Sequence, residues 1–178
     1  MKTVPVAIVG FMGCGKTAVA QMLAALLARR VVDLDEHITR QYKRTPAEII
    51  NEDGEPAFRS VETSALKHLL LSDFNGVLSI GGGGWIDSTN RRLLEDTGAI
   101  TVWLDTPFEV CWQRIESASE VRPMAPTKHK AKALFDERKP VYQTALIRIA
   151  AQPEEPLESL VERVADALKA MENLNART

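Results

Sequence analysis

Gly10-Phe11-Met12-Gly13-Cys14-Gly15-Lys16-Thr17, near the start of the chain, matches the pattern G-x-x-x-x-G-K-[ST] at every fixed position. Glycine lets a backbone wrap closely around an anion and turn its N–H groups inward. A helix that follows such a loop adds a favourable partial positive charge. The stretch therefore predicts a phosphate-binding loop, and the alternative is an ordinary glycine-rich turn with a solvent-exposed lysine.

The residues on either side of this loop supply the context that phosphate binding requires. Val4–Val9 is a continuous apolar run, typical of a strand that is buried on both faces. Thr17–Arg29 has apolar residues at helical spacing. In a loop between strand and helix, Lys16 reaches the β- and γ-phosphates of a nucleotide and the Thr17 hydroxyl binds Mg²⁺. We therefore expect ATP and Mg²⁺ as cofactors.

Further along the chain, strand-like runs alternate with helical patterns. The additional expected strands are Val31–Asp35, Val77–Ile80, Ile100–Leu104 and Ile147–Ala150. Two segments, Thr45–Glu48 and Thr106–Glu109, place Thr at the N-cap, Pro at the first helical position and Glu at the third. This alternation predicts an α/β fold in which helices cover both faces of a parallel sheet.

Length, charge and cysteine content narrow the class of protein. The chain has 178 residues, which is typical of one domain. Its 22 Lys and Arg against 24 Asp and Glu, a net charge of -2, argue against nucleic acid as the main partner. It contains no apolar run long enough for a bilayer and no secretory h-region near Met1. The two cysteines do not indicate a disulfide framework. Together with the missing membrane-spanning and secretory segments, this leads us to expect a cytoplasmic protein that does not bind membranes.

Two carboxylates follow the second expected strand, in Val32-Asp33-Leu34-Asp35. Residues two apart on a strand point to the same face, and the carboxyl ends of parallel strands face the crevice where α/β proteins bind ligands. One carboxylate would then serve Mg²⁺, and the other would accept a hydrogen bond from a substrate hydroxyl and help to remove its proton. Alternatively, the pair opens the next helix and complements its dipole. The spacing alone favours neither interpretation.

Three arginines are candidates for binding an anion. Arg59 and Glu62 lie three apart on a helix, so Glu62 would hold Arg59 in a fixed orientation; the alternative is a weak surface salt bridge. Arg138 lies near the end of another helix. Arg122 lies in the polar segment 117–129, which we interpret as a lid, because a mobile cation assists phosphoryl transfer. Taken alone, each arginine is better explained as a solvated surface residue.

Four consecutive glycines, Gly81–Gly84, follow the expected strand at 77–80. We do not expect so many glycines to serve packing, and they suit a backbone that must come close to a ligand. A flexible linker is the alternative, but it fits poorly at the carboxyl end of a strand.

Taken in order, these motifs resemble the shikimate kinases, small P-loop kinases of aromatic amino-acid biosynthesis. The matching segments cover nearly the whole chain: the P-loop, Asp33-x-Asp35, Glu48-Ile49-Ile50 through Gly54-Glu55 to Phe58-Arg59-x-x-Glu62, Gly81–Gly83, Arg122-Pro123 and Arg138-x-Pro140-x-Tyr142. The resemblance implies a three-layer P-loop NTPase-type fold, similar to nucleoside monophosphate kinases, with a five-stranded parallel sheet. It implies one kinase domain over residues 1–178, with a substrate-binding region at about 35–62 and a lid at about 117–129.

The resemblance also implies an activity and a role for each matching residue. A monomer would transfer the γ-phosphate of ATP to the 3-hydroxyl of shikimate, with Lys16, Asp35 and Arg122 as catalytic residues. Asp35 would bind ring hydroxyls and act as the base, and Arg114 would lie near the adenine. ATP would be bound by Gly13, Cys14, Gly15, Lys16, Thr17, Ala18, Arg114 and Arg122. Shikimate would be bound by Asp35, Arg59, Gly81, Gly82, Gly83 and Arg138, and Mg²⁺ by Thr17 and Asp33.

The chain departs from the family pattern in two places. Met124 and Ala125 follow Arg122-Pro123 where the family more often has two leucines, and Gly84-Trp85 follows the triglycine. The Trp85 ring would either alter the fit of the substrate or pack on the adjacent helix. A kinase for another small molecule such as gluconate, and a non-catalytic nucleotide-binding regulator, are the rival functions. Residues 58–62 and the triglycine favour shikimate over gluconate, and the complete set of charged residues favours a kinase over a regulator.

Overall fold

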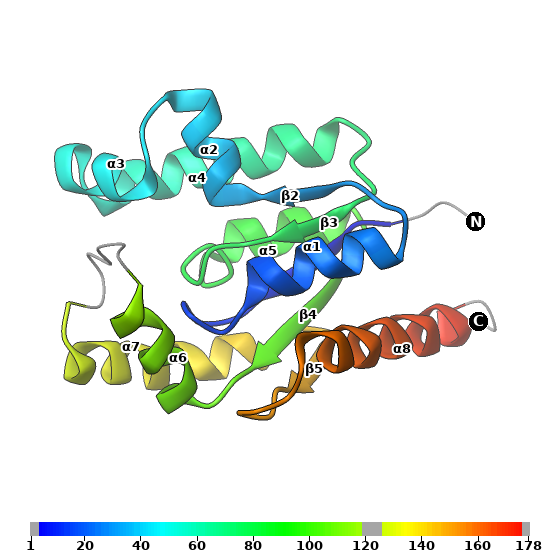
Figure 1. Ribbon diagram of the computed structural model, residues 1–178. Coiled ribbons are helices and arrows are strands. Elements are labelled where there is room, and N and C mark those ends of the chain that lie inside the picture. Colours follow the sequence, from blue (N-terminus) through cyan, green and yellow to red (C-terminus); the bar gives the residue numbers. More distant parts are fainter. Residues whose placement is uncertain (1–3, 119–125, 176–178) are drawn as a thin grey trace.

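A single parallel sheet forms the centre of the molecule. The computed structural model describes residues 4–118 and 126–175, and within them five strands pair in the order β2-β3-β1-β4-β5 (Figure 1). The strands are β1 (Val6–Val9), β2 (Val31–Asp33), β3 (Val77–Ser79), β4 (Ile100–Asp105) and β5 (Ile147–Ala150). Every pairing is parallel, so the predicted five-stranded parallel sheet is confirmed.

Helices cover both faces of the sheet. Those within the described residues are α1 (Lys16–Leu26), α2 (Leu34–Tyr42), α3 (Pro46–Asp53), α4 (Glu55–Leu71), α5 (Ser88–Asp96), α6 (Phe108–Ser117), α7 (Lys128–Tyr142) and α8 (Leu157–Asn175). Helix α1 packs with α8, and α4 packs with α5; Figure 1 shows α1 in front of the sheet and α5 behind it. None of these helices combines the length and the apolar character needed to cross a membrane.

The core lies where the apolar helix faces meet the sheet. Strands β1 and β3 are buried along their whole length, as expected for a parallel sheet that is covered on both sides. An aromatic cluster extends this core to the P-loop. The ring of Phe135 in α7 meets Phe11 edge-on at 5.2 Å between centroids and Phe108 of α6 at 5.5 Å. Through these rings the P-loop is packed against α7, which in turn packs against α6.

The chain after β2 differs from the prediction of a strand over 31–35. Strand β2 ends at Asp33, which caps α2 because its Oδ1 accepts hydrogen bonds from the backbone N–H groups of Asp35 and Glu36, at 3.1 and 3.3 Å. Asp35 therefore lies in the first turn of a helix and does not share a strand face with Asp33. The alternative interpretation, in which the acidic pair opens the next helix, describes the local structure.

The two predicted capping sequences have different outcomes. Thr45 forms a capping box with Glu48 at the start of α3, as predicted. At the other site, α6 begins at Phe108 and has no side-chain cap. The Thr106 hydroxyl instead donates a hydrogen bond to the carbonyl of Cys14 at 3.2 Å. The prediction of a cap at Thr106 is wrong because a contact with the P-loop uses its hydroxyl.

Candidate active site

The P-loop connects β1 to α1 and has the backbone shape that its glycines allow. Gly13 and Gly15 have φ values of 75° and 100°, in the left-handed region that favours glycine. A Cβ added at Gly13 would also lie 2.5 Å from the carbonyl oxygen of Cys111 in α6. Glycine at position 13 is therefore required by the packing of α6 as well as by the curvature of the loop.

The charged and hydroxyl side chains of the P-loop contact partners in and around the loop. The Lys16 ammonium donates to the Phe11 carbonyl at 2.8 Å, so the side chain folds back over the loop. The Thr17 hydroxyl donates to the Asp33 carboxylate at 2.7 Å. Arg114 reaches the loop from α6, and its Nη1 donates to the Gly13 carbonyl at 3.2 Å. Asp33 and Arg114, both predicted to bind the nucleotide or its metal, therefore lie against the P-loop beside Lys16 and Thr17.

The oxygen atoms of Thr17 and Asp33 suit Mg²⁺. This ion prefers hard oxygen ligands and usually takes one or two from a protein, with substrate phosphates and water completing its shell. A hydroxyl and a carboxylate 2.7 Å apart at the end of a phosphate-binding loop match that donor set. Within the described residues, no group of three or more His, Cys, Asp or Glu side chains could hold a metal by itself. The oxygen atoms of Thr17 and Asp33 therefore suit a Mg²⁺ ion that phosphate and water also bind. They do not form a metal site made of protein side chains alone.

A cavity of about 690 Å³ opens beside the P-loop. Its walls come from the P-loop, α2, α3, α4, α7 and the glycine loop, the name used here for Gly81–Ile86. The lining residues are Met12, Asp35, Glu36, Thr39, Arg40, Thr45, Pro46, Ala47, Ile50, Phe58, Arg59, Glu62, Gly81, Gly82, Gly83 and Arg138. All six residues predicted to bind the substrate are among them. Arg122 lies outside the described residues, as does most of the predicted lid.

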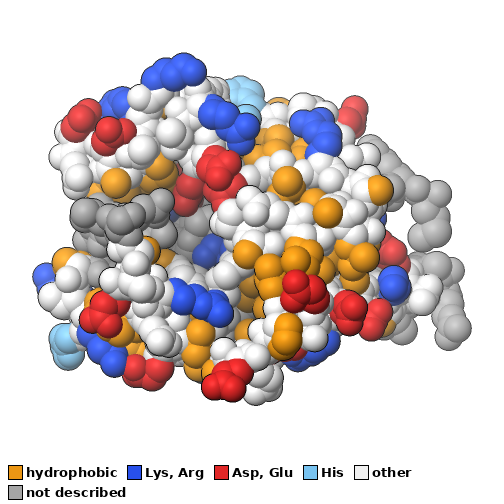
Figure 2. Space-filling view, viewed as in Figure 1, with side chains coloured by type: hydrophobic (Ala, Val, Ile, Leu, Met, Phe, Trp, Pro, Cys, Tyr) orange, Lys and Arg blue, Asp and Glu red, His pale blue; other side chains and the backbone are white. Residues whose placement is uncertain are grey.

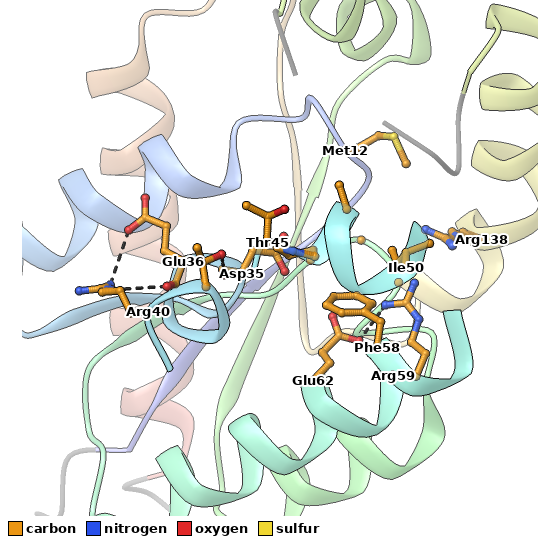
Figure 3. Close-up of a pocket in the computed structure, with 16 residues that line it drawn as sticks. Met12, Asp35, Glu36, Arg40, Thr45, Ile50, Phe58, Arg59, Glu62 and Arg138 are labelled. Carbon is orange, nitrogen blue, oxygen red and sulfur yellow. Dashed lines mark hydrogen bonds and ion pairs between the residues drawn. The ribbon is translucent and has the colours of Figure 1, made fainter. Parts of the chain in front are cut away.

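Opposite charges line different parts of this cavity. Figure 3 shows Asp35 on the left of the close-up, where α2 begins, and Arg59 and Arg138 on the right. In the space-filling view, acidic side chains gather above the hollow in the middle of the molecule, and basic side chains gather below it (Figure 2). The cavity therefore suits a small ligand with hydroxyl groups at one end and a negative charge at the other.

Arg59 is held between two carboxylates of its own helix. Its Nη1 donates to Glu62 at 2.8 Å and its Nη2 to Glu55 at 3.0 Å. Glu62 has 0% exposed side chain, so the alternative of a surface salt bridge is wrong. Burial raises the pKa of Glu62 from 4.5 to about 7, although Arg59 acts to lower it. Arg59 therefore has little freedom to turn away from the cavity.

Arg138 differs from Arg59 in having no acidic partner. It lies in α7, is only 7% exposed and lines the cavity. No carboxylate within residues 4–118 and 126–175 forms an ion pair with it. A buried cation without a counter-ion is costly. The cavity is therefore built to receive an anion beside Arg138.

The glycine loop is packed more tightly than the sequence suggested. A Cβ at Gly84 would come 2.7 Å from the side chain of Ile80 and 2.8 Å from that of Glu62. At Gly83 it would collide with the guanidinium of Arg59. The expectation that these glycines have no packing role is therefore wrong for both positions, because their lack of side chains makes room for the Arg59–Glu62 pair.

Trp85 does not line the cavity. Its ring is 2% exposed, and its indole N–H donates to the carbonyl of Val141 in α7 at 3.1 Å. Of the two alternatives for this residue, packing against a helix is therefore the correct one.

Several residues in and around the cavity had no assigned role from sequence. Glu55, which does not line the cavity but pairs with Arg59, could have been found, because it precedes Arg59 by four residues in a helix and that spacing brings side chains together. Met12, Ile50 and Phe58 line the cavity. No local signal separates them from ordinary core residues, since an apolar side chain looks the same in a cavity wall and in a core.

The family model and the sequence relatives agree on one family. A family model for shikimate kinase matches residues 12–169. The chain is 36% identical over 155 residues to a shikimate kinase of Persephonella marina, which covers 87% of this chain and 93% of the relative. It is 39% identical over 166 residues to one of Cereibacter sphaeroides, covering 92% and 81%. A solved structure of shikimate kinase from Acinetobacter baumannii in complex with shikimate superposes with a TM-score of 0.87, at 32% identity, over 94% of this chain and 93% of that one.

Proposed function

The chain belongs to the shikimate kinase family, and from this premise we propose that it transfers the γ-phosphate of ATP to the 3-hydroxyl of shikimate. The products are shikimate 3-phosphate and ADP. The observation that carries this proposal is the distribution of charge in the cavity beside the P-loop, with Asp35 in one wall and Arg59 and Arg138 in another. Shikimate has the matching chemistry, because its ring has a carboxylate at one end and hydroxyl groups at the other.

The two arginines bind the shikimate carboxylate in this proposal. Guanidinium groups pair with carboxylates through two parallel hydrogen bonds, which fixes orientation as well as charge. Glu55 and Glu62 hold Arg59 in place, and Arg138 gains the counter-ion that the described chain does not offer it. The backbone of the glycine loop at Gly81–Gly83 contributes further contacts along the same wall.

Asp35 acts on the hydroxyl that receives the phosphate. Its carboxylate reaches the glycine loop, since a Cβ at Gly81 would lie 3.2 Å from Asp35 Oδ1. From there it accepts a hydrogen bond from the 3-hydroxyl and takes its proton as the new bond from oxygen to phosphorus forms. The bond between the γ-phosphorus and the bridging oxygen breaks, and ADP leaves with that oxygen.

The P-loop holds the nucleotide while the transfer takes place. Lys16 exchanges the Phe11 carbonyl for the β- and γ-phosphates, and the loop from Gly13 through Cys14 and Gly15 to Ala18 surrounds them. Thr17 and Asp33 hold Mg²⁺, which when bound neutralises part of the phosphate charge. Arg114 lies beside the adenine, and Arg122 contacts the phosphates from the lid at about 117–129. Both assignments follow from the family resemblance.

We also propose the setting in which the enzyme works. Residues 1–178 form one kinase domain, with a substrate-binding region at about 35–62, and the protein acts as a cytoplasmic monomer. A net charge of -2 supports a role without nucleic acid. Sedimentation of the purified protein at several concentrations tests the monomer.

The test of the function is ADP release from ATP and Mg²⁺, with shikimate, gluconate or no acceptor present. We expect release only with shikimate. Release with gluconate alone would keep the P-loop assignment and overturn the acceptor site. Nucleotide binding without release for any acceptor would favour a regulator over a kinase.

A further inference from the structure

Two hydrogen bonds that run in opposite directions join the glycine loop to the end of α7. The Tyr142 hydroxyl donates to the Gly82 carbonyl at 2.8 Å, and the Trp85 indole N–H donates to the Val141 carbonyl at 3.1 Å. Each segment thus supplies one side-chain donor and one backbone acceptor. We call these two bonds the clasp. Both donor side chains are buried, with Tyr142 1% and Trp85 2% exposed.

The surroundings of the clasp hold its donors in place. The ring of Tyr142 stacks on Trp103 at 6.3 Å between centroids and 22° between planes. A Cβ at Gly82 would lie 3.1 Å from the Tyr142 hydroxyl, so a larger residue at position 82 would crowd this bond. The Val141 carbonyl belongs to the last turn of α7 and has no partner four residues on in the helix. It accepts instead from the Trp85 indole and from the backbone N–H and hydroxyl of Thr144, at 3.1 and 2.7 Å.

The glycine loop is anchored separately on its other side by α5. The amide of Asn90 donates to the Gly84 carbonyl at 3.0 Å. Arg91 donates to the carbonyls of Trp85 and Ile86, both at 2.7 Å. Within the described parts of the chain, the clasp supplies the hydrogen bonds between this loop and α7. Loss of the clasp would therefore free α7 from the loop while the loop itself stays anchored.

The position of Arg138 links the clasp to the cavity. Arg138 lies four residues before Tyr142, so the two side chains share a face of α7. Both Arg138 and Gly82 line the cavity. A fixed end of α7 therefore means a fixed placement of the Arg138 guanidinium relative to the backbone of the glycine loop.

We propose that Trp85 and Tyr142 are positioning residues for carboxylate binding, because the clasp sets the spacing between Arg138 and the glycine loop. This inference rests on the proposed function, in which Arg138 binds the carboxylate of shikimate and the backbone of the glycine loop contacts the substrate along the same wall. The physical reason is that a bidentate pair depends on geometry, so a binding group that moves by a fraction of an ångström loses affinity. Neither bond of the clasp involves a P-loop residue, so we expect ATP binding to change much less than shikimate binding.

The chain offers a matched control. The Thr144 hydroxyl donates to the same Val141 carbonyl at 2.7 Å but does not belong to the glycine loop. Trp85→Phe and Tyr142→Phe each remove one bond of the clasp and keep an aromatic ring. Because the Tyr142 hydroxyl also interacts with Arg138 directly, Trp85→Phe is the variant that isolates the clasp. Thr144→Val removes a bond to the same acceptor and leaves the clasp intact. Comparing the three separates the clasp from a general weakening of the end of α7.

The experiment measures KM for shikimate and for ATP, kcat, and the Kd for shikimate by calorimetry. We expect each clasp variant to raise KM and Kd for shikimate about fivefold, the equivalent of about one net hydrogen bond. KM for ATP stays within about twofold of the wild-type value, and Thr144→Val matches the wild type. The methyl ester of shikimate, which has no negative charge at this position, shows no difference between the wild type and the clasp variants.

Three results would overturn the inference. A lower Tm in both clasp variants with an unchanged KM for shikimate would mean a purely structural role. An equal loss of affinity for the ester would mean that the clasp does not act on the carboxylate. If the wild type does not bind shikimate, the proposed function fails and the inference falls with it. If Tyr142→Phe does not fold, Trp85→Phe decides by the same measurements.

Discussion

Arg138 and Arg59 are two cavity arginines in opposite electrostatic situations. Arg138 is buried without a carboxylate among the described residues, and Arg59 is the partner of the fully buried Glu62. Removing an unpaired buried charge relieves a desolvation cost, whereas removing one member of a buried pair leaves the other uncompensated. The two arginines therefore contribute to substrate binding in the same way and to stability in opposite ways.

This contrast leads to a prediction for Arg138→Met and Arg59→Met. Both variants lose affinity for shikimate by at least about tenfold, because a charged hydrogen-bonded pair is lost. Arg138→Met raises the free energy of unfolding by about 1 kcal/mol, and Arg59→Met lowers it by roughly 3 kcal/mol. Urea unfolding and calorimetry with shikimate measure both quantities. A loss of ATP affinity equal to the loss for shikimate would contradict the assignment of these arginines to the carboxylate.

Glu62 should make stability depend on pH. Burial raises its pKa from 4.5 in the unfolded chain to about 7 in the fold, so the folded state binds this proton more tightly. The resulting stabilisation is fully present below pH 4.5 and is lost as the pH rises towards 7. Within that window, the free energy of unfolding falls by at most about 1 kcal/mol per pH unit, averaged over the window, from this group alone.

Glu62→Gln tests this pH dependence, because glutamine does not titrate. Between pH 5 and pH 6.5, the wild type should lose roughly 2 kcal/mol more unfolding free energy than the variant. Urea unfolding at several pH values measures the difference. If the unfolding free energy changes with pH by the same amount in the wild type and in the variant, Glu62 has an ordinary pKa in the folded state.

Asp35 is the predicted base, and Glu36 is its neighbour in the same cavity wall. Asp35→Asn should lower kcat by about 10²- to 10⁴-fold, because an amide does not accept the hydroxyl proton. The fold, followed by circular dichroism and Tm, stays intact. Glu36→Gln is the control, since the Glu36 carboxylate lies 3.6 Å from Arg40 at the exposed edge, and its kcat should change less than about threefold. Near-normal turnover in Asp35→Asn would remove Asp35 from the catalytic role.

At the scale of elements, two similar sequences at helix starts have different tasks. Thr45 forms the capping box of α3, and that helix forms part of the cavity wall. Thr106 binds the Cys14 carbonyl and so ties the P-loop to the end of β4. The same pattern of Thr, Pro and Glu thus stabilises a helix in one place and a nucleotide-binding loop in the other.

The two threonines serve as each other's controls. Thr45→Ala should lower the free energy of unfolding by about 1 kcal/mol, the usual value of an N-cap, and leave KM for ATP unchanged. Thr106→Val should raise KM for ATP about fivefold, because the P-loop loses a buried hydrogen bond. Urea unfolding and steady-state kinetics distinguish the two effects. An unchanged KM for ATP in Thr106→Val would show that the P-loop holds its shape without this bond.

At the scale of the whole molecule, the parallel sheet brings the parts of the site together. In the register of the sheet, Ser79 pairs with Ile8 of β1 and with Asp33 of β2, so three strands reach the same edge together. The P-loop, the proposed metal ligands Thr17 and Asp33, and the glycine loop all start from this edge, where α/β proteins bind their ligands. The proposed nucleotide and acceptor sites are neighbours but are made from different segments.

Thermal unfolding tests this separation. Shikimate and ATP with Mg²⁺, each at about 100 times its Kd, should each raise Tm by roughly 5 to 10 °C, the effect of about 2.7 kcal/mol of binding energy. Arg138→Met should lose only the shift with shikimate, and Lys16→Met only the shift with the nucleotide. The loss of both shifts in one variant would mean that the two sites depend on each other for their structure.

Interactions between near neighbours in the chain allowed much of this protein to be predicted from sequence. The P-loop pattern, the apolar strands and the capping box at Thr45 each depend on residues that are close in the chain. The same holds for Arg59 and Glu62, whose spacing of three already places them together in any helix. Alternation of strands and helices then predicted a parallel sheet with helices on both faces, and the family resemblance implied that it has five strands, as the structure shows. These features follow from sequence because backbone geometry alone brings their residues together.

The tertiary structure decided what depends on residues far apart in the chain. Thr106 binds Cys14 from 92 positions away, and Trp85 binds a backbone carbonyl 56 positions away. No local pattern encodes such pairs, because they exist only once the sheet has placed the segments beside each other. The same holds for Gly83 and Gly84, whose lack of side chains makes room for a buried ion pair. Packing over long sequence distances therefore determines the shape of the cavity, whereas the sequence alone determines its chemical groups.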